Sequence, residues 1–170
     1  MKLIPTPIAA ISLGLAFSMG AAGCASADHH SSASSSKSEE VVESETQSIV
    51  DVLKRYETYA NAGDYESLGG LYTADGVLFP DRFDVFLGAE DITGFYQFAF
   101  SALTLDIDFN IDPANITVAG DVAYATTDSA GTRYIKEADL TVPEVNRELW
   151  VFEKVDGEWK IARYCFNKSE

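Results

Sequence analysis

The chain has 170 residues, enough for one domain and some additional segments, and 46% of them are apolar. Its formal net charge of −15 leaves no basic face to neutralise phosphates, so we expect no nucleic-acid partner. The two histidines, His29 and His30, are adjacent in a Ser-rich stretch, where they either remain solvated or contact a metal weakly. There is no larger His or Cys cluster and no Gly-rich phosphate loop, so the sequence predicts neither a metal nor a cofactor.

The N-terminal segment has the pattern of a secretory signal. Lys2 supplies a short positive segment, and residues 3–19 form an apolar run that is too short to span a membrane. The motif AAGC that ends at Cys24 resembles a bacterial lipobox, which implies a lipoprotein signal peptide at residues 1–23 and a lipidated Cys24. The alternative is an ordinary signal peptide cut nearby, with Cys24 incidental. We therefore expect an exported protein that is lipid-anchored to a bacterial membrane, on the periplasmic side of the outer membrane if the host has two membranes.

Residues 24–43 are rich in Ser and Ala and contain almost no large apolar side chain, so we expect a flexible tether. If Cys24 carries lipid, Cys165 has no cysteine partner. A lone cysteine in the middle of a predicted strand usually behaves as a small apolar residue, and no histidine of the predicted domain is present to activate it.

The folded domain is expected to begin with helices. Ser44 and Gln47 fit a capping box, and the apolar residues that follow recur at helical spacing until Gly63. Asp64 can cap a second, short helix. A turn at Asp75-Gly76 then leads into a short strand at residues 77–79, which Pro80 ends, and residues 81–88 are expected to be a loop.

A third helix is predicted at residues 89–102, and after it the pattern changes to that of strands. Residues 104–112 alternate apolar and polar side chains, which is typical of a half-buried strand. Further strands are predicted at residues 116–119, 122–127 and 132–136, and Pro143 is expected in an acidic loop. Helices that are separated from a run of strands in this way predict an α+β domain.

The last predicted element is a β-hairpin. Asp156-Gly157 lies between two alternating apolar runs, which is the strongest short-range hairpin signal. Counting outward from this turn places Phe152 opposite Ile161, Trp150 opposite Arg163, and Glu148 opposite Cys165. On this count one face carries the following side chains: Glu148, Trp150, Phe152, Trp159, Ile161, Arg163 and Cys165. The other face carries a second set: Leu149, Val151, Glu153, Lys160, Ala162, Tyr164 and Phe166. Both faces hold large apolar groups, so we expect helices to cover one and a partner subunit to cover the other.

The order of several short motifs resembles that of the nuclear-transport-factor-2-like superfamily, in its SnoaL-like and ketosteroid-isomerase-like branch. The motifs are YANAGDYESLGGLYTADGVLFP, LGAEDITGFY, VAGDVAYATT and RELWVFEKVDGEWKIA. The resemblance covers residues 49–167 and assigns residues 44–168 to this domain. It implies a cone-shaped, strongly curved antiparallel sheet with three helices of the N-terminal half on its concave face. It also implies a pocket between sheet and helices, and a homodimer through the convex face.

The resemblance also implies roles for individual residues. Ketosteroid isomerase uses an Asp base together with a Tyr and a protonated acid that donate to the enolate oxygen. Tyr56 takes the place of that Tyr, and Glu148 takes the place of the protonated acid. Pro80 stands where the base would be, and the nearest carboxylate is Asp81, one residue further on.

Each of these assignments has a structural alternative. Tyr56 can simply pack in the core, and Glu148 can pair with Arg163 on the same face of the hairpin. The predicted ligand contacts are Tyr59, Tyr96, Trp150 and Arg163. Residues such as Tyr59 and Tyr96 are more often part of a core than ligand contacts. The incomplete set of catalytic residues favours binding of a small, mostly apolar molecule. The alternatives are a cofactor-independent isomerase, dehydratase or cyclase that uses Tyr56, Glu148 and Asp81, and a structural dimerisation module.

Overall fold

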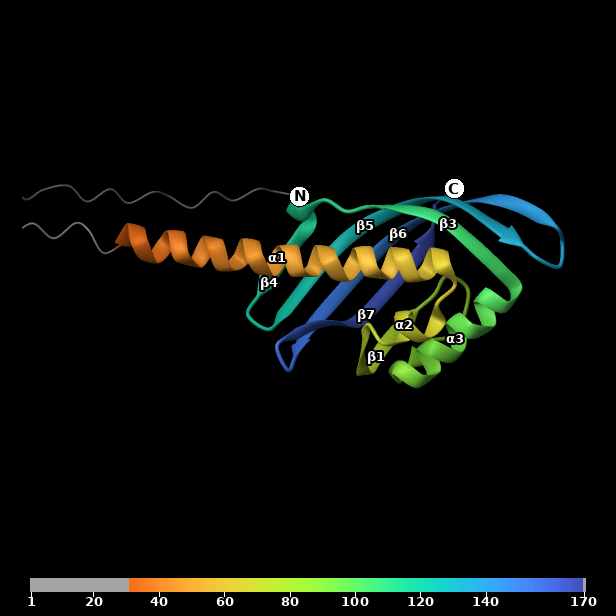
Figure 1. Ribbon diagram of the computed structural model, residues 1–170, viewed down its shortest axis with the longest axis horizontal. Helices are drawn as coiled ribbons and strands as arrows, with labels where there is room; N and C mark the ends of the chain where they lie inside the picture. The colour runs from red at the N-terminus through yellow and green to blue at the C-terminus, as the bar shows by residue number, and fades with distance from the viewer. Residues whose placement is uncertain (1–30, 170) are drawn as a thin grey trace, which may run out of the picture.

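A long helix, α1 (Ser31–Ala62), lies along a strongly curled sheet of seven strands in the computed structural model, which describes residues 31–169 (Figure 1). Two shorter helices, α2 (Tyr65–Gly69) and α3 (Gly88–Ala102), lie together near the C-terminal end of α1. This arrangement confirms the predicted α+β class with three helices packed on a curved sheet. The predicted signal peptide and Cys24 lie outside the described residues.

The helix α1 begins well before the residue at which a start was predicted. It begins at Ser31, and the predicted N-cap residue Ser44 lies inside it, where its carbonyl accepts a hydrogen bond from Ser48 Oγ at 3.0 Å. The predicted tether is therefore helical over residues 31–43, the part of it that the structure describes. A helix that is already packed adds one hydrogen bond for each further residue. Since residues 31–43 contain neither Gly nor Pro, nothing in them stops it.

The connection after α1 follows the predicted capping residues. Gly63 adopts a left-handed conformation with φ of 68°, which ends the helix. Asp64 then caps α2 by accepting from the backbone of Ser67 at 3.0 Å. The chain continues into β1 (Tyr72–Phe79), so the turn predicted at Asp75-Gly76 is instead an irregularity within a longer strand. The predicted loop at residues 81–88 contains the short strand β2 (Phe86–Leu87), which pairs with β1.

The sheet has the order β2-β1-β7-β6-β5-β3, and β4 (Ile116–Ala119) also pairs with β5. The pair of β1 and β7 (Glu158–Lys168) is parallel, whereas the other pairs are antiparallel. The sheet is therefore mixed, not wholly antiparallel as predicted. The connection between β1 and β7 contains α3 and the intervening strands, so it is long enough for β7 to return parallel to β1.

Like β1, the strands β5 and β6 are longer than predicted. β5 (Val122–Ile135) is continuous through the gap that was predicted at residues 128–131, and it pairs with β3 (Leu103–Asn110) and with β6 (Leu140–Val155). Pro143 lies within β6 and pairs with Thr132, so the predicted acidic loop is wrong. Pro143 is tolerated because β7 pairs with β6 only from Asn146 onward, which leaves this part of β6 without a second neighbouring strand.

The closing hairpin has the predicted turn but a different register beyond it. Asp156 and Gly157 have φ values of 53° and 84°, as a two-residue turn requires, and Phe152 pairs with Ile161. An irregularity next to Ala162 then shifts the register by one residue, so Trp150 pairs with Tyr164 and Glu148 with Phe166. A shift of one residue exchanges the faces of a strand. Tyr164 therefore packs on the helix-covered face and Arg163 on the opposite face, which reverses both predictions.

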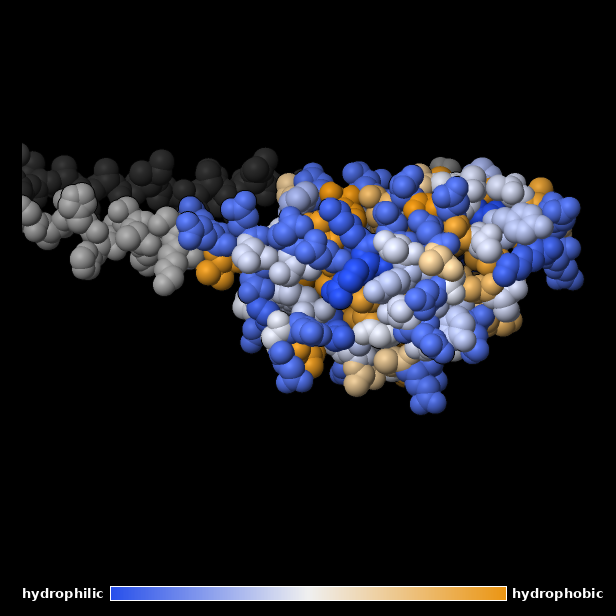
Figure 2. Space-filling model, viewed as in Figure 1, coloured by the Kyte–Doolittle hydropathy of each residue, from blue (hydrophilic) through white to orange (hydrophobic). Residues whose placement is uncertain are grey.

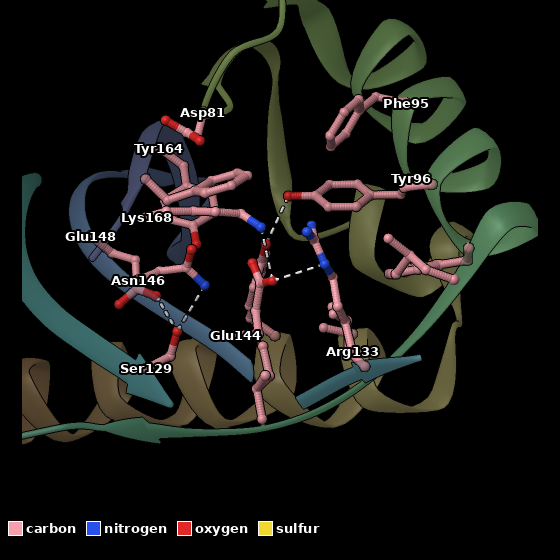
Figure 3. Close-up of a pocket in the computed structure, with 18 of the residues that line it drawn as sticks. Asp81, Phe95, Tyr96, Ser129, Arg133, Glu144, Asn146, Glu148, Tyr164 and Lys168 are labelled. Atoms are coloured by element: carbon pink, nitrogen blue, oxygen red, sulfur yellow. Dashed lines mark hydrogen bonds and ion pairs between the residues drawn. The ribbon is translucent and has the colours of Figure 1, made fainter. Parts of the chain in front are cut away.

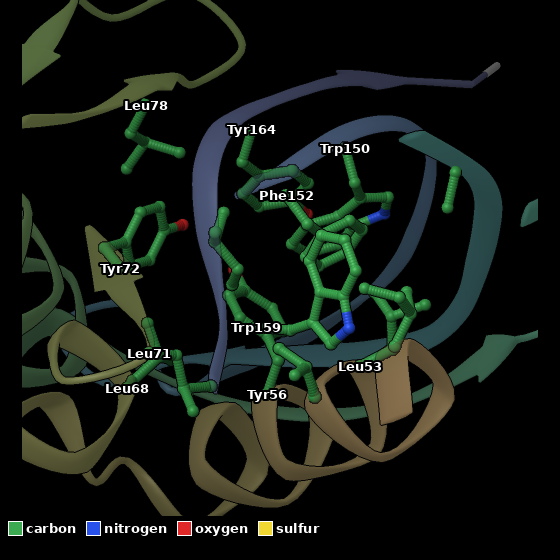
Figure 4. Close-up of a cluster of buried hydrophobic side chains, with 14 of the residues drawn as sticks. Leu53, Tyr56, Leu68, Leu71, Tyr72, Leu78, Trp150, Phe152, Trp159 and Tyr164 are labelled. Carbon is green, nitrogen blue, oxygen red and sulfur yellow. The ribbon is translucent and has the colours of Figure 1, made fainter. Parts of the chain in front are cut away.

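The core lies between α1 and the concave face of the sheet (Figure 4). Leu53 and Tyr56 of α1 meet Trp150 and Phe152 of β6 there, and both β6 side chains have no exposed surface. Side chains of α1 also complete the free edge of β3. Asn61 exchanges two hydrogen bonds with the backbone of Ile107, at 2.7 and 2.9 Å. These contacts hold α1 across the sheet. The surface of the molecule seen from the same side is mostly hydrophilic (Figure 2).

Candidate functional site

A cavity of about 250 Å³ opens between α3, the loop after β1 and the concave ends of β5, β6 and β7 (Figure 3). Its walls are mainly apolar. The apolar and aromatic side chains that line it include Phe95, Tyr96, Phe98, Phe100, Leu105, Ile107, Phe109, Tyr164 and Phe166. Mostly apolar walls with a few polar groups are usual for a small-molecule site.

The polar groups of the cavity form two rows on neighbouring strands. Glu144, Asn146 and Glu148 alternate along β6 and all point to the concave side. Ser129 and Arg133 lie on the same side of β5, beside them. These rows run from the buried centre of the sheet toward its outer end. They form because both strands continue far beyond the part of the sheet that α1 covers (Figure 1).

Glu148 lies at the inner end of these rows and is buried. Its Oε2 accepts from Thr127 Oγ1 and its Oε1 from Ser129 Oγ, both at 2.6 Å. The Trp150 indole N–H donates to Thr127 Oγ1 at 2.9 Å, so the one hydroxyl proton of Thr127 goes to Glu148. Burial raises the pKa of the Glu148 carboxyl, while the bonds from Ser129 and Thr127 oppose that shift. The carboxyl is thus held firmly and is easier to protonate than a solvated one.

Asn146 connects to this network. Its Nδ2 donates to Ser129 Oγ at 3.4 Å, while its Oδ1 is buried without a hydrogen-bond partner. When Glu148 is protonated it can donate to Ser129 Oγ, which frees the hydroxyl proton of Ser129. A half-turn of the Asn146 amide would then give this proton an acceptor. The network can therefore accommodate Glu148 in either protonation state.

Tyr56 belongs to a chain of three buried hydroxyl groups. Its hydroxyl lies 2.8 Å from that of Tyr96, which lies 3.0 Å from that of Tyr72. Burial raises the pKa of Tyr56 well above its usual range, and the nearby Tyr96 adds to the shift, so the phenol stays protonated. If Tyr72 donates to Tyr96 and Tyr96 to Tyr56, the proton of Tyr56 remains available to the cavity that Tyr56 lines.

Asp81 also lines the cavity, from the loop that follows β1. Pro80 is buried at the end of the strand, and the chain turns at Arg82, whose φ is 63°. This turn brings the Asp81 side chain to the cavity although it lies one residue beyond the expected position. Its ion-pair partner is the exposed Arg82, at 3.4 Å. The structure thus brings Tyr56, Glu148 and Asp81 to one cavity.

The structure places the other predicted ligand contacts differently. Tyr96 lines the cavity, whereas Trp150 is fully buried behind it and Tyr59 packs against the core. Arg163 lies on the opposite face of the sheet because of the register shift, and its Nη1 donates to the carbonyl of Ala162 at 2.6 Å. The alternative pairing of Glu148 with Arg163 is therefore wrong.

Five polar residues of the cavity were not predicted: Ser129, Arg133, Glu144, Asn146 and Lys168. The alternation of Glu144, Asn146 and Glu148 before Trp150 was the available signal, because it is the pattern of one face of a strand. Pro143 obscured that signal, since proline is rare within a sheet.

The described residues contain neither a cluster of metal ligands nor a helix that could span a membrane. Between residues 31 and 169 there is no group of three or more His, Cys, Asp or Glu side chains that could hold a metal ion. Within the same range, none of the helices carries an apolar stretch long enough to cross a bilayer.

Comparisons with solved structures show similar folds. A ketosteroid isomerase-like protein from Erwinia carotovora atroseptica has a TM-score of 0.70 and 26% identity, over 74% of this chain and 97% of that protein. A nuclear transport factor 2-like superfamily protein from Salmonella enterica serovar Typhimurium has a TM-score of 0.65 and 22% identity, over 74% of this chain and 91% of that protein. A nuclear transport factor 2-like protein with a cystatin-like fold from Novosphingobium aromaticivorans has a TM-score of 0.61 and 21% identity, over 82% and 89%.

A comparison with curated proteins found no match. The profile of the SnoaL-like domain matches residues 42–164, which is most of the chain and includes most of the helices, of the sheet and of the cavity. The curled sheet, the three helices that cover it and this match agree: the chain belongs to the SnoaL-like domain family, within the nuclear-transport-factor-2-like superfamily.

Proposed function

We propose that the domain binds a small, mostly apolar molecule in the cavity between α3 and the concave face of the sheet. The observation that carries this proposal is the contrast between the walls and the inner end of the cavity. Aromatic and aliphatic side chains form the walls, while the buried Glu148 and the hydroxyl of Tyr56 offer hydrogen bonds at defined positions. Such a site holds an apolar body and orients one or two polar atoms.

Neighbouring side chains of the protein hold the polar groups in place, which supports binding. Glu148 is fixed by two hydroxyl donors and Tyr56 by Tyr96, so little side-chain freedom would be lost on binding. The aromatic walls support each other in the same way. Phe95 packs against Phe86 and Tyr96, with ring centroids 4.7 and 5.2 Å apart.

A cavity-filling variant tests this proposal. Ala99 lies on α3 and lines the cavity, so Ala99→Trp should fill the space. Ser101 is exposed on the same helix and does not line the cavity, which makes Ser101→Trp the matched control. We expect wild type and the control to bind members of a panel of small apolar alcohols and ketones in calorimetry, and Ala99→Trp to lose that binding at unchanged folding. Equal binding by both variants would refute the cavity as the site.

A second candidate function is proton transfer, as in a cofactor-independent isomerase, dehydratase or cyclase. The observation that favours it is the presence of Asp81 in the same cavity as Tyr56 and Glu148. A base, a phenol donor and an acid that is easily protonated are the groups needed to enolise a carbonyl compound. In this mechanism Asp81 removes a proton next to the carbonyl, while Tyr56 and Glu148 donate hydrogen bonds to the oxygen that gains charge.

Enolisation of a panel of cyclic ketones separates the two candidates. If the domain is an enzyme, Tyr56→Phe should lower the rate about 10²- to 10³-fold, because one oxyanion donor is lost. Asp81→Asn should abolish turnover, whereas Asp84→Asn, an exposed neighbour in the same loop, should have little effect. Turnover that persists in Asp81→Asn excludes Asp81 as the base. If the wild type binds ketones without turning them over, the enzymatic function is excluded and only the binding function remains.

The cellular setting is also a proposal, and it rests on the sequence around Cys24. We infer that the chain is exported and lipid-anchored through Cys24. Replacing Cys24 with Ala should release the protein from the membrane fraction of the expressing cell. Retention of the intact Cys24→Ala variant in that fraction would show that the anchor lies elsewhere.

A further inference from the structure

An ionic cluster of Arg133, Glu144 and Lys168 lines the outer part of the cavity (Figure 3). Arg133 Nε lies 3.3 Å and Lys168 Nζ 3.0 Å from the same atom, Glu144 Oε2. Glu144 is the most buried of the three, with 8% of its side chain exposed, while Arg133 and Lys168 are about one-third exposed. Two cations therefore share one carboxylate oxygen at the wall of an apolar cavity.

The hydrogen bonds of this cluster are incomplete. Arg133 Nε is buried and, although it is ion-paired with Glu144, it lacks a partner in hydrogen-bonding geometry. A guanidinium group has five N–H donors in a planar fork that suits a carboxylate with two oxygens. Arg133 and Lys168 are ion-paired with the same oxygen of Glu144, Oε2. Both cations thus retain capacity for a second anionic group.

The charges in the cavity point the same way. Arg133 and Lys168 contribute two positive charges and Glu144 one negative charge, so the cluster has a formal charge of +1 in a chain whose net charge is −15. The other acidic side chains that line the cavity are Asp81, which is ion-paired with Arg82, and Glu148, whose bonds are made to Thr127 and Ser129. A monoanionic group beside Arg133 and Lys168 would neutralise the cluster.

We propose that the ligand of this cavity is amphipathic, with an apolar body against the aromatic walls and a carboxylate bound between Arg133 and Lys168. This inference rests on the proposed binding function and names its ligand class. In the free protein Glu144 occupies the two cations, and the carboxylate of the ligand completes their hydrogen bonds. Glu144 then both holds the two cations in place and competes with the ligand carboxylate for them.

Paired probes test the inference. Octanoate and octan-1-ol share an apolar chain and differ in the charge of the head group, and calorimetry measures the binding of each to the purified protein. We expect octanoate to bind about tenfold or more tightly than octan-1-ol, because hydrogen bonds to charged groups are the stronger ones. Arg133→Gln and Lys168→Gln should each weaken octanoate about tenfold or more and change octan-1-ol less than about twofold.

Two further variants complete the test. Lys160→Gln is the matched control, since Lys160 lies on β7 like Lys168, is exposed to the same extent and does not line the cavity. It should bind both probes like wild type. Glu144→Gln should bind octanoate more tightly than wild type, because the competitor for the cations is gone. If the cluster had only a structural role, Glu144→Gln would instead bind octanoate more weakly than wild type.

The outcomes distinguish this inference from the proposed function. Equal affinity of wild type for octanoate and octan-1-ol would overturn the carboxylate assignment while the binding function stands. Weaker octanoate binding in Glu144→Gln, with the fold intact by circular dichroism, would also overturn it. Failure of octanoate, octan-1-ol and the apolar panel to bind at all would refute the binding function itself.

Discussion

The rings of Trp150 and Tyr164 stack face to face, with centroids 3.6 Å apart and planes inclined by 7°. They meet because the irregularity next to Ala162 moves Tyr164 to the concave face of β7. Tyr56 of α1 contacts both rings edge-on, at 4.9 and 5.3 Å. This three-ring cluster connects the long helix to the centre of the sheet (Figure 4), and two of its rings, Tyr56 and Tyr164, also line the cavity.

The stack of Trp150 and Tyr164 should therefore contribute strongly to the stability of the domain, although Tyr164 lies near the end of the chain. Replacing Tyr164 with Ala removes a buried aromatic ring and its stacking contacts, which should lower the free energy of unfolding by about 3–5 kcal/mol. Tyr134→Ala, at the exposed outer end of β5, should cost less than about 1 kcal/mol. Urea denaturation of both variants measures the difference. A small loss in Tyr164→Ala would contradict the described register of the hairpin.

Glu148 should make stability depend on pH. Its folded-state pKa is raised, chiefly by burial, so the folded protein holds this proton more tightly than the unfolded chain. Its contribution is complete below the unfolded pKa and is lost as pH rises through the raised pKa. Glu148→Gln is always neutral and should lack this loss, so the variant should gain stability relative to wild type as pH rises from about 4 through the raised pKa. Urea denaturation across this range measures the trend.

The matched control for Glu148 is Glu137→Gln, which makes the same chemical change at an exposed turn. The difference in the free energy of unfolding between Glu148→Gln and wild type should change with pH. The corresponding difference for Glu137→Gln should not follow the same trend. A pH-independent difference for Glu148→Gln would show that the buried carboxyl titrates alike in the folded and unfolded chains.

Glu45 should hold the middle of α1 on the closing hairpin. Its carboxylate accepts from Lys154 Nζ at 2.6 Å and from Trp159 Nε1 at 2.7 Å, and these bonds lower its pKa, Lys154 most. A lowered folded-state pKa means that the contribution is complete above the unfolded value and is lost as pH falls through the folded value. Glu45→Gln should cost about 1 kcal/mol near neutral pH, and less in acid.

Thermal unfolding at several pH values measures the effect of Glu45→Gln. Glu43→Gln, on the exposed side of α1, is the control and should leave stability nearly unchanged at every pH. If Glu45→Gln and Glu43→Gln behave alike, the contacts of Glu45 with the hairpin contribute nothing measurable.

The homodimer remains a prediction, with a revised surface. Ala162 and Tyr164 of the predicted interface are buried within the domain, so they cannot contact a partner. Tyr124 and Leu149 are half-exposed on the uncovered face of β5 and β6, and we expect them to form the interface instead. The wild type should then sediment as a dimer and Leu149→Glu as a monomer, while Leu87→Glu, an exposed site on β2, should remain dimeric. A monomeric wild type at micromolar concentration would exclude the dimer.

The end of α1, the start of α2, the closing turn and the α+β class were determined by local sequence. Asp64 as a cap, the left-handed Gly63 and the Asp156-Gly157 turn act within a few residues of chain, so their patterns can be recognised without a structure. The family resemblance assigned Tyr56 and Glu148 to a pocket, and both line the cavity, although the register used to place Glu148 does not hold beyond Ile161. Glu148 keeps its concave position because it lies on β6, where the alternation is unbroken.

The tertiary structure decided what depends on contacts between distant segments. The irregularity next to Ala162 has no local signal, because it forms where β7 must pair with β1 on one side and β6 on the other, and it decides that Tyr164 and not Arg163 faces the core. Pro143 is accepted in β6 only because β7 ends before reaching it. The same extension of β5 and β6 brings Arg133 and Glu144 beside Lys168, so the ionic cluster of the cavity arises from strand pairing that no short stretch of sequence encodes.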